Sequence, residues 1–193
     1  MSRRLTLAVL LASAPVAADP EAPPDMSDQA VGADLGLATG GRVTPGGLRV
    51  DGHYLYQLSD HDWFDGTAAF TFGGGSPACF YDRSDAYVCQ HGLAQGDGAE
   101  VIASVRHFLG GHDTYWPFIH GGIGVGLARF GSDAVSGLAI PVHAGGGLRV
   151  SITPELAITA QAELDLGIGV FGHGLGLEPQ AGVDLTAGVE FRL

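Results

Sequence analysis

The 193-residue chain contains no lysine, and all nine of its basic residues are arginines. These arginines are scattered along the sequence and stand against 21 acidic residues, which gives a formal net charge of −12. Proteins that bind nucleic acid usually present clustered basic residues to the phosphates. The absence of such a cluster predicts that the chain has no nucleic-acid partner.

Long apolar runs are missing as well. No stretch reaches the ~18 consecutive apolar residues that predict a membrane-spanning helix. No segment keeps a helical period of 3.6 residues over several turns either. The sequence therefore does not predict a helical fold or a helical membrane protein.

The first 18 residues have the three parts of a secretory signal peptide. Arg3 and Arg4 form a basic start, residues 5–11 a short apolar core, and residues 16–18 a small-residue cleavage site. No cysteine follows that site, which argues against a lipid anchor. Residues 19–29, DPEAPPDMSDQ, are acidic and rich in proline, and we expect them to form a short disordered lead-in. Removal of the signal peptide would leave seven arginines against 21 acidic residues.

Apolar residues recur at every second position in eight segments of the remaining chain. The clearest is residues 154–170, PELAITAQAELDLGIGV, where an apolar row from Leu156 to Ile168 alternates with a row that contains Glu163 and Asp165. A period of two is typical of a strand with two different faces. The predicted strands cover residues 30–40, 46–58, 63–73, 98–109, 115–130, 137–152, 154–170 and 178–193. Together they predict an all-β domain over residues 30–193, an eight-stranded antiparallel up-and-down transmembrane β-barrel.

The predicted connections differ in length between the two ends of this barrel. SDHD, GGHDT and TPE are short and would lie at one end. The long connection 74–97 and a longer segment between the seventh and eighth strands would lie at the other, with a short TPGG turn after the first strand. Short turns at one end and longer loops at the other are typical of membrane-spanning barrels.

The two faces of the strands predict which side meets lipid. Outward rows would carry leucine, valine, isoleucine, alanine and glycine, with aromatic residues near the strand ends, which suits lipid better than an interlocked soluble core. An eight-stranded barrel has room inside for side chains only, so inward charges should pair. The residues expected to form this polar network in the lumen are Asp34, Arg49, Asp51, His53, Asp65, Glu100, Arg106, His120, His143, Arg149, Gln161, Glu163, Asp165, Asp184, Glu190 and Arg192. We expect Arg106, Arg149 or Arg192 to pair with Glu163 and Asp165.

Two stretches resemble the small outer-membrane β-barrel family of OmpA/OmpX type: VRHFLGGHDTYWPFIHGGIGVGLARF, with its Pro-aromatic pair and alternating glycines, and GGGLRVSITPELAITAQAEL, with its tight Thr-Pro turn. The C-terminal AGVEFRL is similar to the last-strand signal for barrel insertion, although it ends in Leu193 and not in an aromatic residue. The resemblance implies the cell outer membrane of a Gram-negative bacterium. It also implies contact with outer-membrane lipid, lipopolysaccharide and the barrel-assembly machinery, and no cofactor.

The long connection holds both cysteines of the chain, Cys79 and Cys89. In an oxidising compartment two neighbouring cysteines are expected to form a disulfide, which would stiffen an exposed hairpin. The aromatic residues between them, Phe80, Tyr81 and Tyr87, are candidates for a contact surface at the loop tip, or they pack locally on the disulfide.

The sequence predicts neither a catalytic site nor a metal site. A metal would need more ligands than the two cysteines and His91, and for His120 and His143 the default expectation is hydrogen bonding in the lumen. A lipid A-modifying enzyme would need a serine, a histidine and an acid near the outer rim. The nearest serines, Ser76, Ser84 and Ser136, have no suitably spaced histidine.

The expected function is therefore a structural or surface-interaction role in the outer membrane, with an unknown surface ligand. A lipid A-modifying barrel enzyme and a soluble, secreted or periplasmic lipocalin-like barrel are the alternatives. A narrow pore is disfavoured because the predicted lumen is filled with charged side chains.

Overall fold

The computed structural model describes residues 28–41, 43–73, 78–81, 84, 86–90, 96–110, 114–130 and 135–193. The predicted signal peptide and nearly all of the acidic lead-in lie outside these residues. Within the described part of the chain, no helix has the length and hydropathy needed to cross a membrane.

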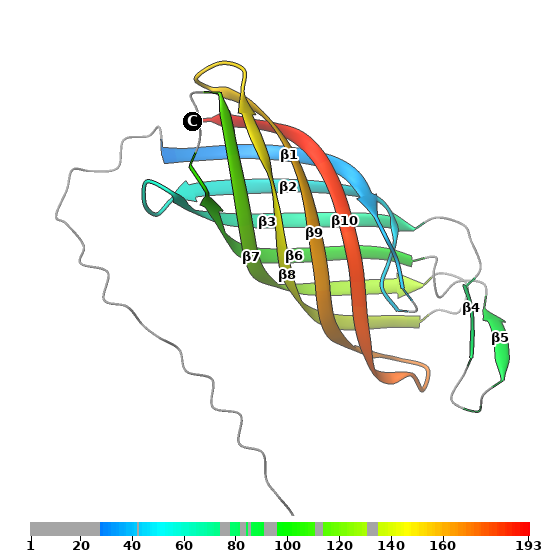
Figure 1. The fold of residues 1–193 in the computed structure, drawn as a ribbon. Coiled ribbons are helices and arrows are strands. Elements are labelled where there is room, and N and C mark those ends of the chain that lie inside the picture. Colours follow the sequence, from blue (N-terminus) through cyan, green and yellow to red (C-terminus); the bar gives the residue numbers. More distant parts are fainter. Residues whose placement is uncertain are drawn as a thin grey trace, which may run out of the picture.

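Eight antiparallel strands close into a barrel (Figure 1). Each strand pairs with its neighbours in the chain, and the last strand pairs with the first, Ala30 lying opposite Arg192. The barrel strands are β1 (Gln29–Ala38), β2 (Gly47–Gln57), β3 (Asp62–Gly73), β6 (Gly96–Phe108), β7 (Tyr115–Phe130), β8 (Val135–Ser151), β9 (Leu156–Phe171) and β10 (Gly176–Arg192). The predicted fold class and all eight predicted strands are confirmed.

Two further strands lie within the connection between β3 and β6. They are β4 (Ala78–Tyr81) and β5 (Tyr87–Gln90), and they pair only with each other to form a two-stranded sheet. Figure 1 shows this hairpin at the end of the barrel opposite the C-terminus. The sequence does not predict these strands, because the connection shows no long alternating pattern.

The short connections at the C-terminal end of the barrel agree with the expectation. Residues 58–61, 109–114 and 152–155 join the strands there. At the other end, the long connection predicted between the last two strands is wrong, because β9 continues to Phe171 and β10 already begins at Gly176. His173 and Gly174 adopt positive φ angles of 53° and 81°, which lets the chain reverse within four residues.

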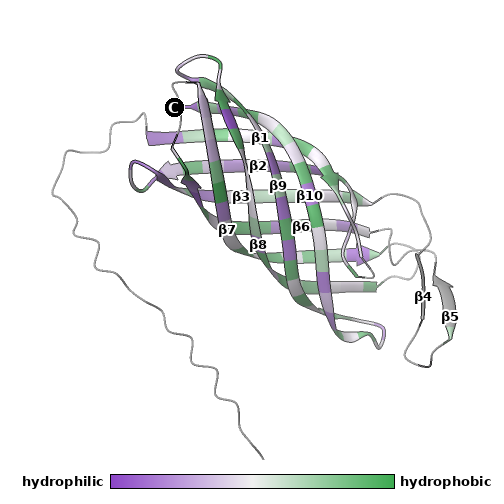
Figure 2. Ribbon diagram, viewed as in Figure 1, coloured by the Kyte–Doolittle hydropathy of each residue, from purple (hydrophilic) through white to green (hydrophobic). Residues whose placement is uncertain are grey.

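Buried and exposed positions alternate along the barrel strands, and Figure 2 shows hydrophilic and hydrophobic residues following one another along the ribbon. In β2, for example, Arg49 and Asp51 are buried while Leu48 and Val50 are exposed on the outer face. The predicted aromatic residues near the strand ends, Tyr54, Tyr56, Phe64, Phe70, Phe72, Tyr115 and Phe191, are exposed or half-buried.

The outer surface forms an apolar belt around the barrel. Mid-strand residues such as Val101, Ile123 and Leu185 expose 55–68% of their area. A soluble monomer rarely exposes a contiguous apolar patch of more than a few hundred Å². Because the barrel wall is apolar outside and polar inside, the arrangement is the reverse of a soluble lipocalin-like barrel and fits a surrounding of lipid.

Candidate functional site

The barrel interior holds three layers of side chains along its axis. An apolar layer closes the end near β4 and β5, charged and polar residues fill the middle, and aromatic residues line the end near the C-terminus. These layers form because the inward residues of each strand change in character from one end of the strand to the other. In β7 the inward row runs from Phe118 through His120 and Gly124 to Ala128 and Phe130.

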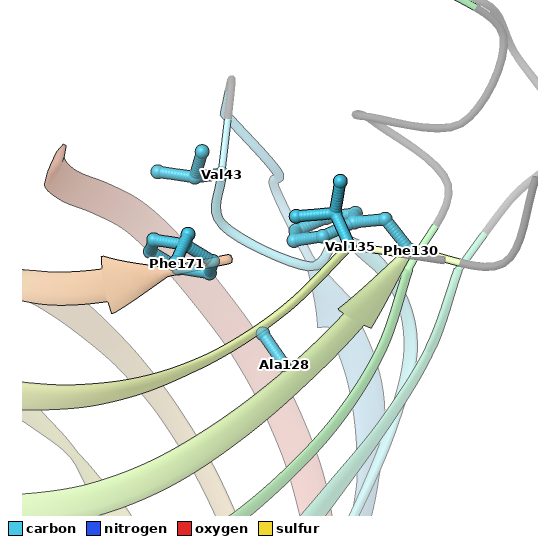
Figure 3. Packing of buried hydrophobic residues seen from close by; sticks show 5 residues of the cluster. All are labelled: Val43, Ala128, Phe130, Val135 and Phe171. Carbon is cyan, nitrogen blue, oxygen red and sulfur yellow. The ribbon is translucent and has the colours of Figure 1, made fainter. Parts of the chain in front are cut away.

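The apolar layer consists of Val43, Ala128, Phe130, Val135 and Phe171, with Leu175 packed against them (Figure 3). Val43 comes from the connection between β1 and β2 and is only 1% exposed. The rings of Phe130 and Phe171 lie 6.2 Å apart, centroid to centroid. The layer therefore covers the charged middle of the barrel with side chains from four separate segments.

The first polar cluster is centred on Glu190, which is fully buried. Arg106 donates from Nη1 to Glu190 Oε1 at 2.5 Å and from Nη2 to Asp65 Oδ2 at 2.8 Å. Arg149 donates from Nε to Glu190 Oε2 at 2.9 Å. The ring of His53 lies 3.4 Å from Glu190 through Nε2 and 3.3 Å from Asp34 through Nδ1. One carboxylate thus receives charge-assisted contacts from three strands other than its own.

The second polar cluster surrounds Arg49 and is richer in acids. The guanidinium lies 2.9 Å from Asp51, 2.5 Å from Asp184, 3.9 Å from Glu163 and 4.0 Å from Glu100. Because buried carboxylates are costly unless they are paired, one arginine shared among four acids needs further positive partners.

Between them, His143 and His120 contact two of these acids and one further carboxylate, that of Asp165. Nδ1 of His143 lies 2.5 Å from Asp165 and 3.0 Å from Glu163, and Nε2 lies 2.8 Å from Glu100. Nδ1 of His120 lies 3.4 Å from Glu163. Both ring nitrogens of His143 thus face carboxylate oxygens, whereas a neutral imidazole has only one N–H to donate.

A metal ion is the other species that this group of side chains could hold. Ligand atoms of His143, Glu163 and Asp165 lie within 4.8 Å of one another. A histidine nitrogen and carboxylate oxygens suit transition metals such as Zn²⁺. A histidine binds a metal through a deprotonated ring nitrogen, so a metal here would replace the contacts of Nδ1 of His143 with Glu163 and Asp165.

Glycines on the inner face make room for this network. A methyl group at Gly124 would overlap Oε1 of Glu100 and Nε2 of His143, and one at Gly145 would overlap His120. Gly124 of β7 and Gly145 of β8 are therefore explained by the carboxylate and the histidine rings that lie over them.

Substitution of Gly124 by alanine is expected to destabilise the barrel by about 1–3 kcal/mol, because the added methyl displaces Glu100 from His143. Urea unfolding of the protein in detergent micelles measures this loss. Gly121→Ala is the matched control on the outer face of the same strand, where a methyl group makes only an ordinary contact. Equal stabilities of the two variants would contradict the packing described here.

Fifteen of the sixteen residues expected in the lumen network are buried or half-buried inside the barrel. The exception is Arg192, which is exposed at the C-terminal mouth, with its guanidinium 5.8 Å from the centre of the Trp63 ring. The expected partners of Glu163 and Asp165 are wrong: these acids contact Arg49, His120 and His143.

The strand register explains that error. Asp165 lies opposite His143, whereas Arg149 lies opposite Thr159, six residues earlier in β9. At ~3.3 Å per residue this separation is about 20 Å. Arg106 and Arg149 therefore lie in the other cluster and share Glu190.

Some interior residues were missed. Thr159 donates to Oδ1 of Asp34 at 2.9 Å, and Glu178 is buried near the start of β10. The inward aromatic residues Phe118, Phe130 and Phe171 were missed too. All five residues stand an even number of positions from the inward polar residues of their own strand. This spacing could have identified them as inward-facing.

The candidates in the long connection are only partly described. Cys79 lies directly opposite Cys89 in the pairing of β4 with β5, and Tyr81 lies opposite Tyr87. The structure describes only the backbone of these two strands and not their side chains, that of Phe80 included. The disulfide therefore stays a prediction. His91 and Ser76 lie outside the described residues. In the described barrel strands, no hydrogen bond joins a serine or threonine hydroxyl to a histidine ring.

No protein-family model matches the chain, and no curated protein matches it. Among solved structures, the chain is similar to Neisserial surface protein A, with 12% identity and a TM-score of 0.60 over 86% of this chain and 96% of that one. The N-terminal barrel domain of Pseudomonas aeruginosa OprF gives 16% identity and a TM-score of 0.47 over 84% and 97%. The outer membrane enzyme PagL gives 15% identity and a TM-score of 0.49 over 85% and 99%.

Identities this low compare folds and not activities. The likeness to Neisserial surface protein A agrees with the closed eight-stranded barrel. The chain thus has the fold of the small eight-stranded outer-membrane β-barrel proteins of Gram-negative bacteria.

Proposed function

We propose that the chain is an integral outer-membrane protein in which a closed, rigid barrel anchors the connection between β3 and β6 as a surface-contact element. Outer-membrane barrels place their short turns in the periplasm and their longer loops outside the cell. In this orientation the C-terminus faces the periplasm, and the β4–β5 hairpin faces outward.

The closed interior is the observation that carries this proposal. Arg49, Glu100, Asp165 and Asp184 border a cavity of about 60 Å³, and a second cavity beside Arg49 measures only about 20 Å³. These volumes hold a few water molecules, and the apolar layer around Phe130 covers them on the outer side. A barrel filled in this way suits anchoring better than conduction.

The long connection supports the surface role. In the described part of the chain, it is the one connection that forms a sheet of its own. Its paired strands bring Tyr81 opposite Tyr87 and carry Phe80, and aromatic residues are enriched in protein interfaces. The belt would contact outer-membrane lipid and lipopolysaccharide, and the barrel-assembly machinery would insert the chain.

The cysteines of the hairpin are expected to be joined by a disulfide in the purified, unreduced protein, because Cys79 and Cys89 lie opposite each other. Denatured protein should then react with a polyethylene-glycol maleimide only after reduction, with a gel shift for two thiols. Labelling of both cysteines without reductant would contradict the disulfide.

Replacement of Phe80, Tyr81 and Tyr87 together by alanine is expected to reduce adhesion by about tenfold or more, because aromatic residues at the centre of an interface each contribute more than about 1 kcal/mol. The measurement is the attachment of cells that display the protein to immobilised fibronectin, laminin and collagen. His173→Asn, in an exposed turn at the same end of the barrel, is the matched control.

The outcome separates the two parts of the proposal. Attachment that survives the triple substitution would place the contact surface elsewhere on the protein. Absence of attachment by the unaltered protein to all three surfaces would count against the adhesive role, while the anchoring barrel would still be tested by membrane fractionation.

A further inference from the structure

The periplasmic mouth of the barrel contains a pocket of about 140 Å³ that the proposed function does not use. Its walls include Trp63, Phe108 and Trp116, and its polar lining includes Arg149 and Arg192. The chain has only two tryptophans, and both line this pocket.

The aromatic walls are held in place by edge-to-face packing. The ring of Phe108 lies 6.4 Å from Trp63 and 6.2 Å from Trp116, with interplanar angles of 84° and 85°. Such perpendicular pairs are a preferred geometry of aromatic rings and keep both indoles in fixed orientations. The pocket therefore offers preformed apolar surfaces at an opening to the periplasm.

Two arginines and two acids complete the lining. The guanidinium of Arg192 lies 5.8 Å from the centre of the Trp63 ring, and the side chain of Arg149 keeps 18% of its area exposed. Asp60 and Glu190 also line the pocket, but Glu190 is fully buried and is already bound by Arg106 and Arg149. Indoles next to arginines fit a peptide that carries both prolines and carboxylates.

A segment with this chemistry directly precedes the barrel. Residues 19–27, DPEAPPDMS, contain three prolines and three acids and no basic residue. The first strand begins at Gln29, and the next residue, Ala30, lines the pocket and lies opposite Arg192. The chain thus enters the barrel at the edge of the pocket.

The length of the segment is sufficient to reach the pocket. At no more than ~3.6 Å per residue, Asp25 can lie up to about 14 Å from Gln29, and Pro23 up to about 22 Å. Both distances exceed what a pocket beginning at Ala30 requires. Because the segment is joined to the barrel by so few residues, its effective concentration at the pocket is in the millimolar range, and a weak contact is enough to fill it.

We propose that residues 19–27 bind back into the periplasmic mouth of the same barrel, with prolines against Trp63 and Trp116 and carboxylates toward Arg149 and Arg192. Proline-rich segments bind aromatic-lined grooves at low entropic cost because their extended conformation is largely preformed.

Tryptophan fluorescence tests the proposal directly, since both tryptophans report on the pocket. Two chains are compared in detergent micelles, one beginning at Asp19 and one at Asp28, with acrylamide as an uncharged quencher. With the segment bound for about half of the time at millimolar effective concentration, the quenching constant of the shorter chain should be about twofold larger. A longer chain with Asp19→Asn, Glu21→Gln and Asp25→Asn should resemble the shorter chain.

The controls separate the possible occupants of the pocket. Arg192→Gln should raise the quenching constant of the chain that begins at Asp19 by a larger factor than that of the shorter chain, in which the guanidinium only neighbours the Trp63 ring. Equal quenching of the two unsubstituted chains would overturn the proposal. Protection that disappears on tenfold dilution would also overturn it, because the segment would then come from a second copy. Heat-modifiable gel migration confirms that each variant is folded before it is compared.

Discussion

Replacement of Arg106 by leucine is expected to destabilise the barrel by about 3–5 kcal/mol, because removal of one member of a buried ion pair leaves its partner charge uncompensated. Arg106 is 1% exposed and contacts both Asp65 and Glu190. Its guanidinium also lies 4.4 Å from the centre of the Phe118 ring. The variant therefore loses two charge-assisted contacts and an aromatic contact in a single change.

Urea unfolding in detergent micelles, followed by tryptophan fluorescence, measures this effect. Arg129→Leu is the matched control, because Arg129 is exposed on the outer face near the rim and lies opposite Ser136. Substitution of an exposed residue of this kind should change the free energy of unfolding by no more than about 0.5 kcal/mol. A loss below about 1 kcal/mol for Arg106→Leu would mean that the cluster around Glu190 contributes little to stability.

Replacement of Ile123 by arginine is expected to cost about 2–4 kcal/mol when the barrel is in a bilayer, the cost of an arginine that faces lipid at mid-depth. Ile123 lies midway along β7 and exposes 55% of its area on the outer face. The cost arises because the arginine would face the apolar interior of the bilayer, and not because a packed side chain is lost. The same substitution at an exposed position in water would be tolerated.

Refolding into phospholipid vesicles at increasing urea concentrations gives the free energy for this comparison. Tyr115→Arg provides the control at the end of the same strand, where the cost should fall to about 0–1 kcal/mol. Similar costs at the two positions would show that depth in the membrane does not matter, which is incompatible with the lipid-facing belt.

The positions of the barrel strands could be predicted because a period of two is a local property of the sequence. The segment predicted at 115–130 coincides with β7, Tyr115–Phe130. The strand predicted from residue 154 begins instead at Leu156, since the Thr153 hydroxyl accepts hydrogen bonds from the backbone N–H groups of Glu155 and Leu156 and extends the turn. Differences of one or two residues of this kind arise from turn chemistry.

The pairing of charges inside the barrel could not be predicted in the same way. The parity of each strand shows which residues point inward, but partners depend on the stagger between strands around the whole barrel. Arg106 and Glu190 are 84 positions apart in the sequence and meet across the lumen. Even between neighbours, a register shift of one residue would reverse which face each side chain occupies.

The short turn between β9 and β10 shows a second feature that the alternating pattern does not predict. Its glycines, in FGHGLGL, suggest a loop, yet the strands continue until only four residues remain between them. The positive φ of His173 is unusual for a residue with a side chain, and an alternating pattern does not reveal it. The β4–β5 hairpin was missed because four-residue strands are too short for the pattern to be distinctive.

Membrane fractionation combined with gel migration tests the central claim, that the apolar belt faces lipid, most directly. The protein is expected in the outer-membrane fraction and to remain there after washing with high salt and urea. Unheated samples should migrate differently from boiled samples, because the closed barrel survives in detergent. A protein recovered wholly in the soluble fraction, with identical migration before and after boiling, would contradict the account.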